Sequence, residues 1–588
     1  MRDRLLLPRL LAVLLLGLVG AVPALAQDAA VLDPVRADSG MVVSARAEAS
    51  QAGLAMLKQG GNAVDAAVAT GFALAVVYPR AGNIGGGGFM VIRQSDGAET
   101  TIDYREKAPM AATRTMYQNE AGKVQPMLSR RGYLASGVPG SVAGLLKALE
   151  QYGTLSRAAV MAPAIRLAEE GFRLSRRQAN DFNERYDVFA QFPGSKRYFT
   201  KGDSTRYYRA GELFVQTDLA AVLKRIRDEG RAGFYRGETA DLIVQEMERG
   251  GGLITHEDLR DYRAVEREPV TATYRGYKVV SMGPPSSGGV ALAQLFNAVE
   301  PYDLGEMGYQ SSAATHLMGE AMRRVFADRA QWLGDSDFVD VPIDALTEPA
   351  YMRERMESFN PYRATPTDSV DHGQPLAAES VETTHYSIVD RDGNAVSVTT
   401  TINGSYGSKV VVDGAGFFLN NEMDDFSVKP GFPNMYGLVG SEANAIEPEK
   451  RMLSSMSPTI VEDPDGELFM VIGTPGGSTI ITTVFQVILN VIDHGMNIQE
   501  AVAAPRIHHQ WKPDNLWYEP FGLAADALRN LKRRGWSVRR GAIWGSRTWG
   551  QAEGITVRSE PVAPGASEMR RIYLGGADPR GNDVALGY

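Results

Sequence analysis

Residues 382–403 read Glu-Thr-Thr-His-Tyr-Ser-Ile-Val-Asp-Arg-Asp-Gly-Asn-Ala-Val-Ser-Val-Thr-Thr-Thr-Ile-Asn. The stretch contains two runs rich in β-branched residues, 384–390 and 395–401, which are separated by Arg-Asp-Gly-Asn at 391–394. An Asp-Gly pair between two such runs is a strong signal for a β-hairpin. The sequence therefore predicts a hairpin whose first strand begins directly after Thr383 and whose second strand ends at Thr401.

Thr383 has two interpretations. A threonine hydroxyl is a weak nucleophile, but it becomes a good one when the residue's own α-amino group is free to act as a base. That arrangement requires the backbone to be cut between Glu382 and Thr383. The alternative is that Thr383 and Thr384 only open a strand, and the stretch taken alone favours this simpler interpretation.

Other blocks of sequence change that balance. They lie at 83–90 (Asn-Ile-Gly-Gly-Gly-Gly-Phe-Met), 103–106 (Asp-Tyr-Arg-Glu), 284–289 (Pro-Pro-Ser-Ser-Gly-Gly), 421–427 (Asn-Glu-Met-Asp-Asp-Phe-Ser), 453–459 (Leu-Ser-Ser-Met-Ser-Pro-Thr) and 473–478 (Gly-Thr-Pro-Gly-Gly-Ser). Together with residues 383–387 and 394–396, they resemble, in the same order, blocks of the γ-glutamyltranspeptidase family. The resemblance extends from about Met41 to the C-terminus.

The resemblance implies a fold, a maturation step and an activity. The fold would be α/β, the four-layer αββα sandwich of the N-terminal-nucleophile hydrolases. Self-cleavage would give a large subunit, 27–382, and a small subunit, 383–588, which together form one intertwined catalytic unit. Thr383 would form a γ-glutamyl ester from glutathione or another γ-glutamyl compound, and the ester would pass to water or to an amino-acid or peptide acceptor.

Several residues have the chemistry that such a site needs. Arg105, with Ser454 and Ser455, is suited to a substrate carboxylate, because a guanidinium binds carboxylates through a planar fork. Glu422 and Asp425 are suited to an ammonium group. Taken singly, each is more typical of a surface charge, but the matching family positions bind the two α-groups of the γ-glutamyl moiety.

The remaining site residues lie near the hairpin or in loops. Gly476 and Gly477 separate a predicted strand from a predicted helix, where backbone N–H groups can hold an oxyanion. Thr401 lies at the end of the hairpin. The matching family positions make Thr401 the helper of the nucleophile and Asn403 a ligand of the substrate amino group, and Tyr436 matches the tyrosine of a lid in some bacterial members.

Composition excludes several classes of protein. The chain has 588 residues, of which 44% are hydrophobic and 22% charged, and a net charge of −9. An acidic chain is a poor candidate for binding nucleic acid. The absence of cysteine excludes disulfides, cysteine-based metal sites and a thiol nucleophile. No histidine pair has the spacing of a helical metal site, so we expect neither a metal nor a redox cofactor.

The first 26 residues have the pattern of an export signal. Arg2 and Arg4 precede an apolar run at 5–22, and Ala-Leu-Ala at 24–26 supplies a cleavage site. An uncleaved membrane anchor is the alternative. No later segment has the length of apolar sequence that a transmembrane helix needs. We therefore expect a signal peptide at 1–26 and a periplasmic or secreted enzyme with no stable membrane span.

Regular elements are predicted along much of the chain. Helices are expected at 45–59, 63–77, 312–332 and 479–492, and most of 141–263 has a helical pattern. Asn62 and Asp65 are suited to cap the second helix. Strands are expected at 274–282, 459–462 and 467–472. The Pro-rich segment from 340 to 382 has the composition of an exposed linker, suited to cleavage at its end.

Two other functions remain open. A β-lactam acylase that acts on glutaryl-cephalosporins would use Thr383 on a different acyl group, although a glutaryl side chain has no ammonium for Glu422 and Asp425 to bind. A non-catalytic periplasmic amino-acid-binding protein would use the same charged residues without any cut before Thr383.

Overall fold

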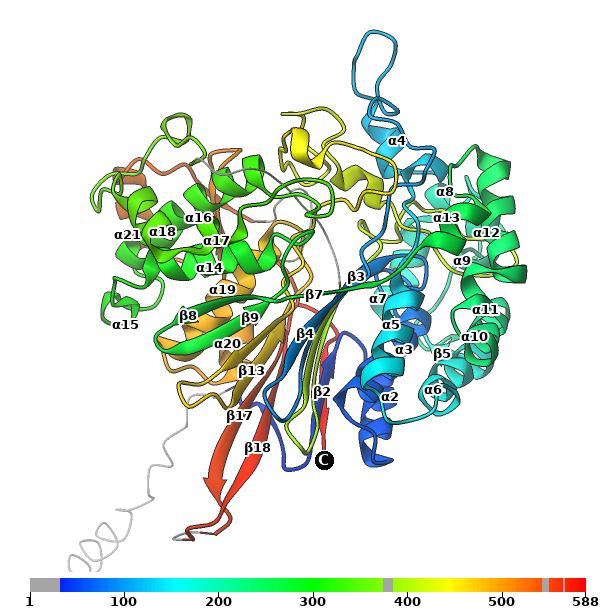
Figure 1. Ribbon diagram of the computed structural model, residues 1–588, viewed down its shortest axis with the longest axis horizontal. Coiled ribbons are helices and arrows are strands. Elements are labelled where there is room, and N and C mark those ends of the chain that lie inside the picture. The colour runs from blue at the N-terminus through cyan, green and yellow to red at the C-terminus, as the bar shows by residue number, and fades with distance from the viewer. Residues whose placement is uncertain (1–31, 374–383, 542–548, 564–565) are drawn as a thin grey trace, which may run out of the picture. The chain divides into compact units, whose positions relative to one another are not determined.

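Two β-sheets lie face to face, and helices cover the outer side of each (Figure 1). The computed structural model describes residues 32–373, 384–541, 549–563 and 566–588, and Pro34–Tyr588 forms one unit. The predicted signal peptide and Thr383 lie outside the described residues. No helix in the described part of the chain is both long and apolar enough to cross a membrane.

The predicted hairpin lies in the middle of one seven-stranded antiparallel sheet. In spatial order its strands are β19 (Val584–Gly587), β2 (Met41–Ser44), β10 (Thr384–Val389), β11 (Ala395–Thr401), β3 (Gly87–Arg93), β4 (Glu99–Asp103) and β7 (Val265–Arg267). Thr384 pairs with Thr400 and Val389 with Ala395. Gly393 turns the chain with a φ of 92°, a conformation that favours glycine.

The second sheet also has seven strands and packs on the first. Its order is β1 (Val35–Ala37), β18 (Met569–Ala577), β17 (Glu553–Pro561), β13 (Leu468–Gly473), β12 (Thr459–Glu462), β9 (Tyr277–Ser281) and β8 (Val270–Tyr274). Buried aliphatic side chains, among them Val43, Val91, Ile460 and Val471, fill the space between the sheets. Side chains from the inner faces of two stacked sheets typically form the core of a β-sandwich in this way.

Helices form the two outer layers. The hairpin sheet is covered by α2 (Ala47–Lys58), α3 (Ala63–Val77) and α5 (Ser141–Tyr152), and α6 (Arg157–Glu170) packs on α3. The other sheet is covered by α14 (Gly288–Val299), α19 (Thr479–Ile492) and α20 (Ile498–Ala503), and α16 (Ser312–Trp332) packs on α14. This arrangement confirms the predicted four-layer αββα sandwich.

Local signals for the central helix are also confirmed. The Asn62 side chain accepts from the N–H of Asp65, and the Asp65 side chain accepts from the N–H of Asn62, which completes a capping box. Every residue of α3 is buried. The helix contacts β10 and β11 directly and forms part of their outer cover.

Shorter elements surround these layers. The helices are α4 (Pro126–Arg130), α7 (Arg176–Glu184), α8 (Tyr186–Phe189), α9 (Pro193–Phe199), α10 (Thr217–Glu229), α11 (Ala232–Tyr235), α12 (Gly237–Gly250), α13 (His256–Asp261), α15 (Leu304–Met307), α17 (Ile343–Thr347), α18 (Pro349–Met356) and α21 (Ala525–Arg533). The strands are β5 (Phe172–Arg173), β6 (Leu213–Phe214), β14 (Ile507–His508), β15 (Leu516–Tyr518) and β16 (Val538–Arg540). The mainly helical character of 141–263 is thus confirmed.

Two predictions about elements differ from the structure. The strand expected at 274–282 is confirmed as β9 from Tyr277, but it begins later than expected, because Arg275 and Gly276 turn the chain between β8 and β9 with positive φ angles. The linker expected from 340 contains α17 and α18. Their apolar residues Leu346, Met352 and Met356 are buried, so the apolar positions outweigh the Pro-rich composition. The end of the linker, 374–382, lies outside the described residues.

Candidate active site

The end of the hairpin brings together the predicted residues Thr401 and Asn403. Thr401 is fully buried, pairs with Gly87 of β3, and its Oγ1 accepts a hydrogen bond of 2.7 Å from the N–H of Asn403. Asn403 has a φ of 63°, which turns the chain out of the strand. The Asn403 Nδ2 donates to the carbonyl of Asn421 at 2.8 Å and to Asp425 Oδ1 at 3.4 Å.

Arg105 forms the centre of a buried charge cluster beside this turn. Its Nη1 donates to Glu422 Oε2 at 2.7 Å and its Nη2 to Asp425 Oδ2 at 2.5 Å. All three side chains are fully buried. Burial by itself lowers the pKa of Arg105, but the nearby carboxylates, above all that of Glu422, raise it above its usual value. The predicted cation and the two predicted anions are therefore direct neighbours.

The acidic residues come from a short turn and from the end of a strand. Glu422 and Asp425 lie on a 3-10 turn, Glu422–Asp425, so both carboxylates face the same guanidinium. Glu106 follows Arg105 and is fully buried. Burial, together with the charge of Glu422, raises the pKa of Glu106 well above its usual value. Within the described residues, Oε1 of Glu106 and Oε1 of Glu422 have no hydrogen-bond partner.

Ser454 and Ser455 lie next to the cluster. Arg105 donates to the carbonyls of Met452 and Leu453, at 3.0 and 3.1 Å, and the two serines follow directly. The Ser454 hydroxyl accepts from the N–H of Met456. The Ser455 hydroxyl accepts from Arg329 at 2.5 Å.

Arg329 is a site residue that the sequence reasoning missed. It lies on α16, is buried, and donates through Nε to Ser287 at 2.8 Å. Burial lowers its pKa to about 9, and Asp425 opposes that shift, so the guanidinium stays protonated near neutral pH. The available signal was a row of charged residues on a helix that is otherwise suited to the core.

Tyr436 contacts the cluster through Asn403. Its hydroxyl donates to Asn403 Oδ1 at 3.0 Å, and only 7% of the residue is exposed. The loop is held by Asp424, which accepts from the N–H of Met435 at 2.9 Å. Gln510 donates to the Tyr436 carbonyl at 3.3 Å. The predicted lid residue is therefore in contact with a predicted ligand of the substrate.

Gly476 and Gly477 lie where the sequence places them, between β13 and α19. Their φ angles are 142° and 62°. A Cβ atom at Gly476 would lie 2.5 Å from Thr479 Oγ1 and 3.1 Å from the Cα of Gly550, so a side chain does not fit at this turn. The turn precedes a helix N-terminus, where the helix dipole favours negative charge.

His385 is a fully buried residue of the hairpin. His385 lies on β10, contacts the hydroxyls of Thr399 and Ser387, and has a pKa that burial lowers to about 3. It is a neutral core residue near neutral pH. Among the described residues, no group of three or more His, Cys, Asp or Glu is arranged to hold a metal ion.

The cluster contains equal numbers of basic and ionised acidic side chains. Arg105 and Arg329 carry two positive charges, Glu422 and Asp425 two negative charges, and the raised pKa of Glu106 favours its neutral form. A zwitterion can enter without adding net charge, with its carboxylate toward the guanidinium and its ammonium toward the acids. Buried charges need such partners.

The fold and this site define an N-terminal-nucleophile hydrolase. A cephalosporin acylase from Bacillus halodurans has a similar structure, with a TM-score of 0.81 and 28% identity over 95% of this chain and 97% of that chain. Residues 49–588 match the family model described as gamma-glutamyltranspeptidase, and the chain belongs to the γ-glutamyltranspeptidase family.

Two further likenesses agree with this family. The glutathione hydrolase proenzyme of Escherichia coli is 46% identical over 559 residues, which are 95% of this chain and 93% of that protein. The structure of Helicobacter pylori γ-glutamyltranspeptidase is 48% identical and has a TM-score of 0.55, covering 56% of this chain and 94% of that chain. The protein is thus an enzyme of a family that acts on small molecules and matures from a proenzyme.

Proposed function

We propose that this enzyme cleaves itself between Glu382 and Thr383 and then transfers γ-glutamyl groups from glutathione and related compounds. The acceptor is water, an amino acid or a peptide. The observation that carries this proposal is the buried cluster of Arg105, Glu422 and Asp425, linked through Asn403 to the end of the β10–β11 hairpin. Thr383 immediately precedes β10 in the sequence.

Each residue then has a defined part in the reaction. Arg105, with Ser454 and Ser455, binds the α-carboxylate of the γ-glutamyl group. Asn403, Glu422 and Asp425 bind its α-ammonium group. Tyr436 covers the occupied site and holds Asn403 in place. These contacts fix the γ-carbonyl group, and such positioning removes part of the entropic barrier of a bimolecular reaction.

The chemistry takes place at Thr383. Its α-amino group accepts the hydroxyl proton as Oγ1 bonds to the γ-carbonyl carbon. The N–H groups of Gly476 and Gly477 hold the oxyanion, where one such donor contributes about 3 kcal/mol. The C–N bond then breaks, and the amine leaves with a proton. Water or an acceptor amine then attacks the ester carbonyl, and the C–O bond to Thr383 breaks. The proton lost by the attacking group returns to the Thr383 hydroxyl. Thr401 orients this hydroxyl.

We also propose how the whole chain matures. Residues 1–26 form a signal peptide that is removed on export to the periplasm or the medium, 27–382 form the large subunit and 383–588 the small subunit. The basic start, the apolar run and the Ala-Leu-Ala at 24–26 support the first step. The word proenzyme in the name of the E. coli relative supports the second.

A glutaryl substrate provides the sharpest test of substrate class, because it lacks the α-ammonium group. A buried charge left without its partner costs several kcal/mol, so wild-type kcat/KM should favour a γ-glutamyl anilide over a glutaryl anilide by more than about 100-fold. Asp425→Asn should reduce this ratio, because it should lower kcat/KM for the γ-glutamyl anilide more than for the glutaryl anilide. Glu447→Gln, at an exposed carboxylate in a nearby loop, is the control. Equal wild-type turnover of both anilides would favour a glutaryl acylase instead.

A further inference from the structure

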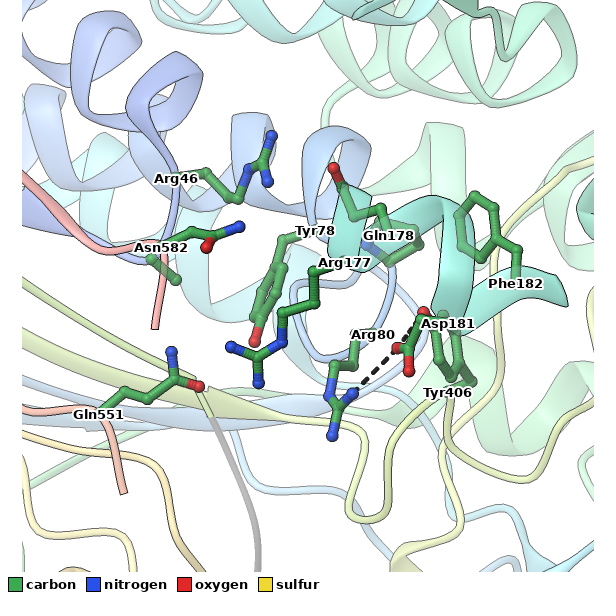
Figure 2. Close-up of a pocket in the computed structure, with 12 residues that line it drawn as sticks. Arg46, Tyr78, Arg80, Arg177, Gln178, Asp181, Phe182, Tyr406, Gln551 and Asn582 are labelled. Carbon is green, nitrogen blue, oxygen red and sulfur yellow. Dashed lines mark hydrogen bonds and ion pairs between the residues drawn. The ribbon is translucent and has the colours of Figure 1, made fainter. Parts of the chain in front are cut away.

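A pocket rich in arginine lies at the same end of the sheets as the start of β10, outside the candidate active site. Its lining includes Arg46, Tyr78, Arg80, Arg177, Gln551 and Asn582. Figure 2 shows the guanidinium groups of Arg80 and Arg177 on the same side of the pocket as the Tyr78 hydroxyl. The charges of both arginines act on that hydroxyl, since both lower the pKa of Tyr78 against the larger effect of burial.

The order of the strands places this pocket across β10 from Arg105. Arg46 follows β2 and Asn582 precedes β19, and both strands lie on one side of β10. Arg105 follows β4, which lies on the other side, beyond β11 and β3. A substrate that extends from Arg105 to the start of β10 therefore continues toward β2 and β19.

Two loops connect the pocket to the candidate active site. Asn83, three residues after Arg80, donates to the carbonyl of Thr401 at 2.8 Å. On the other side, the N–H of Gln551 donates to Thr474 Oγ1 at 3.0 Å, and Thr474 is two residues before Gly476. The pocket is thus bounded by the loops that lead to Thr401 and to the two glycines.

The residues that line the pocket include more basic than acidic side chains, and Arg177 is the arginine among them that contacts no carboxylate of the described residues. Three arginines line it, with a single acidic residue, Asp181, and Asp181 already accepts from Arg80 at 2.9 Å and from Tyr406 at 2.7 Å. The Nη1 of Arg177 donates to the carbonyl of Arg580 at 3.3 Å. Burial raises the pKa of the nearby Asp583 well above its usual value, and the charge of Arg177 acts against that shift. Arg46 is only 6% exposed, and its Nη2 pairs with Glu48 at 3.1 Å, whereas its Nε lacks a hydrogen-bond partner within the described chain.

The size of the pocket restricts what it can hold. Its volume of about 20 Å³ is enough for about one water-sized group, so only the small terminal group of a ligand can enter it. Strands lie about 4.8 Å apart, so β2 and β19 are about one and two spacings from β10. A dipeptide spans about 7 Å when extended, which is enough to place its terminal carboxylate in the pocket.

We propose that this pocket binds the carboxylate of the group on the amine side of the reaction. For glutathione, this is the glycine carboxylate of the leaving dipeptide, and for transfer it is the C-terminal carboxylate of a peptide acceptor. One pocket serves both because the acceptor amine attacks from the position that the leaving amine vacates. The inference rests on the proposed γ-glutamyl transfer. Arg177 provides the charge, and the amides of Gln551 and Asn582 are placed to donate.

The experiment compares two acceptors that differ only in this carboxylate. Transfer from a γ-glutamyl anilide to glycylglycine and to glycylglycinamide is measured in the wild type, Arg177→Met and Arg176→Met. Arg176 is exposed on the same helix and does not line the pocket, so it is the matched control. The ratio of the two kcat/KM values within one variant does not depend on how much of the enzyme is folded.

We expect the wild type and Arg176→Met to prefer glycylglycine by about tenfold, the lower end of the range for a charge-assisted contact. In Arg177→Met the ratio should fall to about one. An equal rate with both acceptors in the wild type, or an unchanged preference in Arg177→Met, would overturn this subsite while leaving anilide hydrolysis intact. A wild type that does not cleave the anilide at all would overturn the proposed function instead.

Discussion

At the scale of residues, the site depends on charges that are buried together. Arg105 contacts Glu422 and Asp425 directly, although these residues are more than 300 positions apart in the chain. Sequence reasoning identified all three from their chemistry and from a family resemblance. It did not identify Arg329, because one arginine within a helix carries no local signal that its side chain reaches Ser455.

Arg105→Lys tests the role of the guanidinium. A lysine cannot donate to two carboxylates through a planar fork and still bind a substrate carboxylate. Loss of a charge-assisted contact costs about 1.5–3 kcal/mol, so KM for a γ-glutamyl anilide should rise about 10- to 150-fold.

Cleavage into two fragments should be retained in Arg105→Lys, because that step needs no bound substrate. Arg114→Lys, at an exposed ion pair, is the control and should keep the wild-type KM. An unchanged KM in Arg105→Lys would remove this residue from the substrate site.

At the scale of elements, the β10–β11 hairpin organises its surroundings. Asp390 in its turn accepts from the N–H groups of Asp392 and Asn394 and also from the N–H of Ala63, at the start of α3. The turn therefore ties the hairpin to the helix that covers it. The Asp-Gly signal predicted the turn, but the link to α3 spans 327 residues, and no local pattern indicates such a contact.

Asp390→Ala should destabilise the fold through this link. It leaves the buried N–H of Ala63 and the partly buried N–H groups of Asp392 and Asn394 without an acceptor, and hydrogen bonds to a charged group contribute about 1.5–3 kcal/mol. The free energy of unfolding, measured by urea denaturation, should fall by at least that amount. Asp392→Ala, at an exposed position of the same turn, should change it by less than about 0.5 kcal/mol. Equal effects of the two substitutions would show that Asp390 makes no special contribution.

At the scale of the whole molecule, prediction from sequence was most successful where the signals were local and strong. The capping box at Asn62, the hairpin and α3 lie where expected. The four layers followed from the family resemblance, and composition alone does not specify them. The segment containing Leu346 and Met352 was misjudged, because Pro-rich sequence around it concealed apolar residues that tertiary packing buries.

Acid should destabilise the molecule partly through buried histidines. Burial lowers the pKa of His508 to about 3, whereas in the unfolded chain it is about 6.5. The unfolded state therefore binds more protons below pH 6.5, and the stability contributed by neutral His508 is lost as the pH falls from there toward the folded pKa. Between pH 7 and 5 this loss is about 2 kcal/mol.

His508→Gln isolates this effect. Urea denaturation of the wild type and the variant should be compared at pH 7 and 5. The wild type should lose about 2 kcal/mol more than the variant on acidification, because the variant has no proton to bind at this position. An equal loss in both proteins would contradict the role of the buried imidazole.

The central claim is that Thr383 becomes an N-terminal nucleophile, and intact mass with N-terminal sequencing of the purified protein tests it most directly. We expect the wild type to give two fragments, with Thr383 first in the smaller one, and to hydrolyse a γ-glutamyl anilide. Thr383→Ala should remain a single chain, uncut before position 383, and be inactive. A wild type that is fully active as one uncleaved chain would contradict the claim.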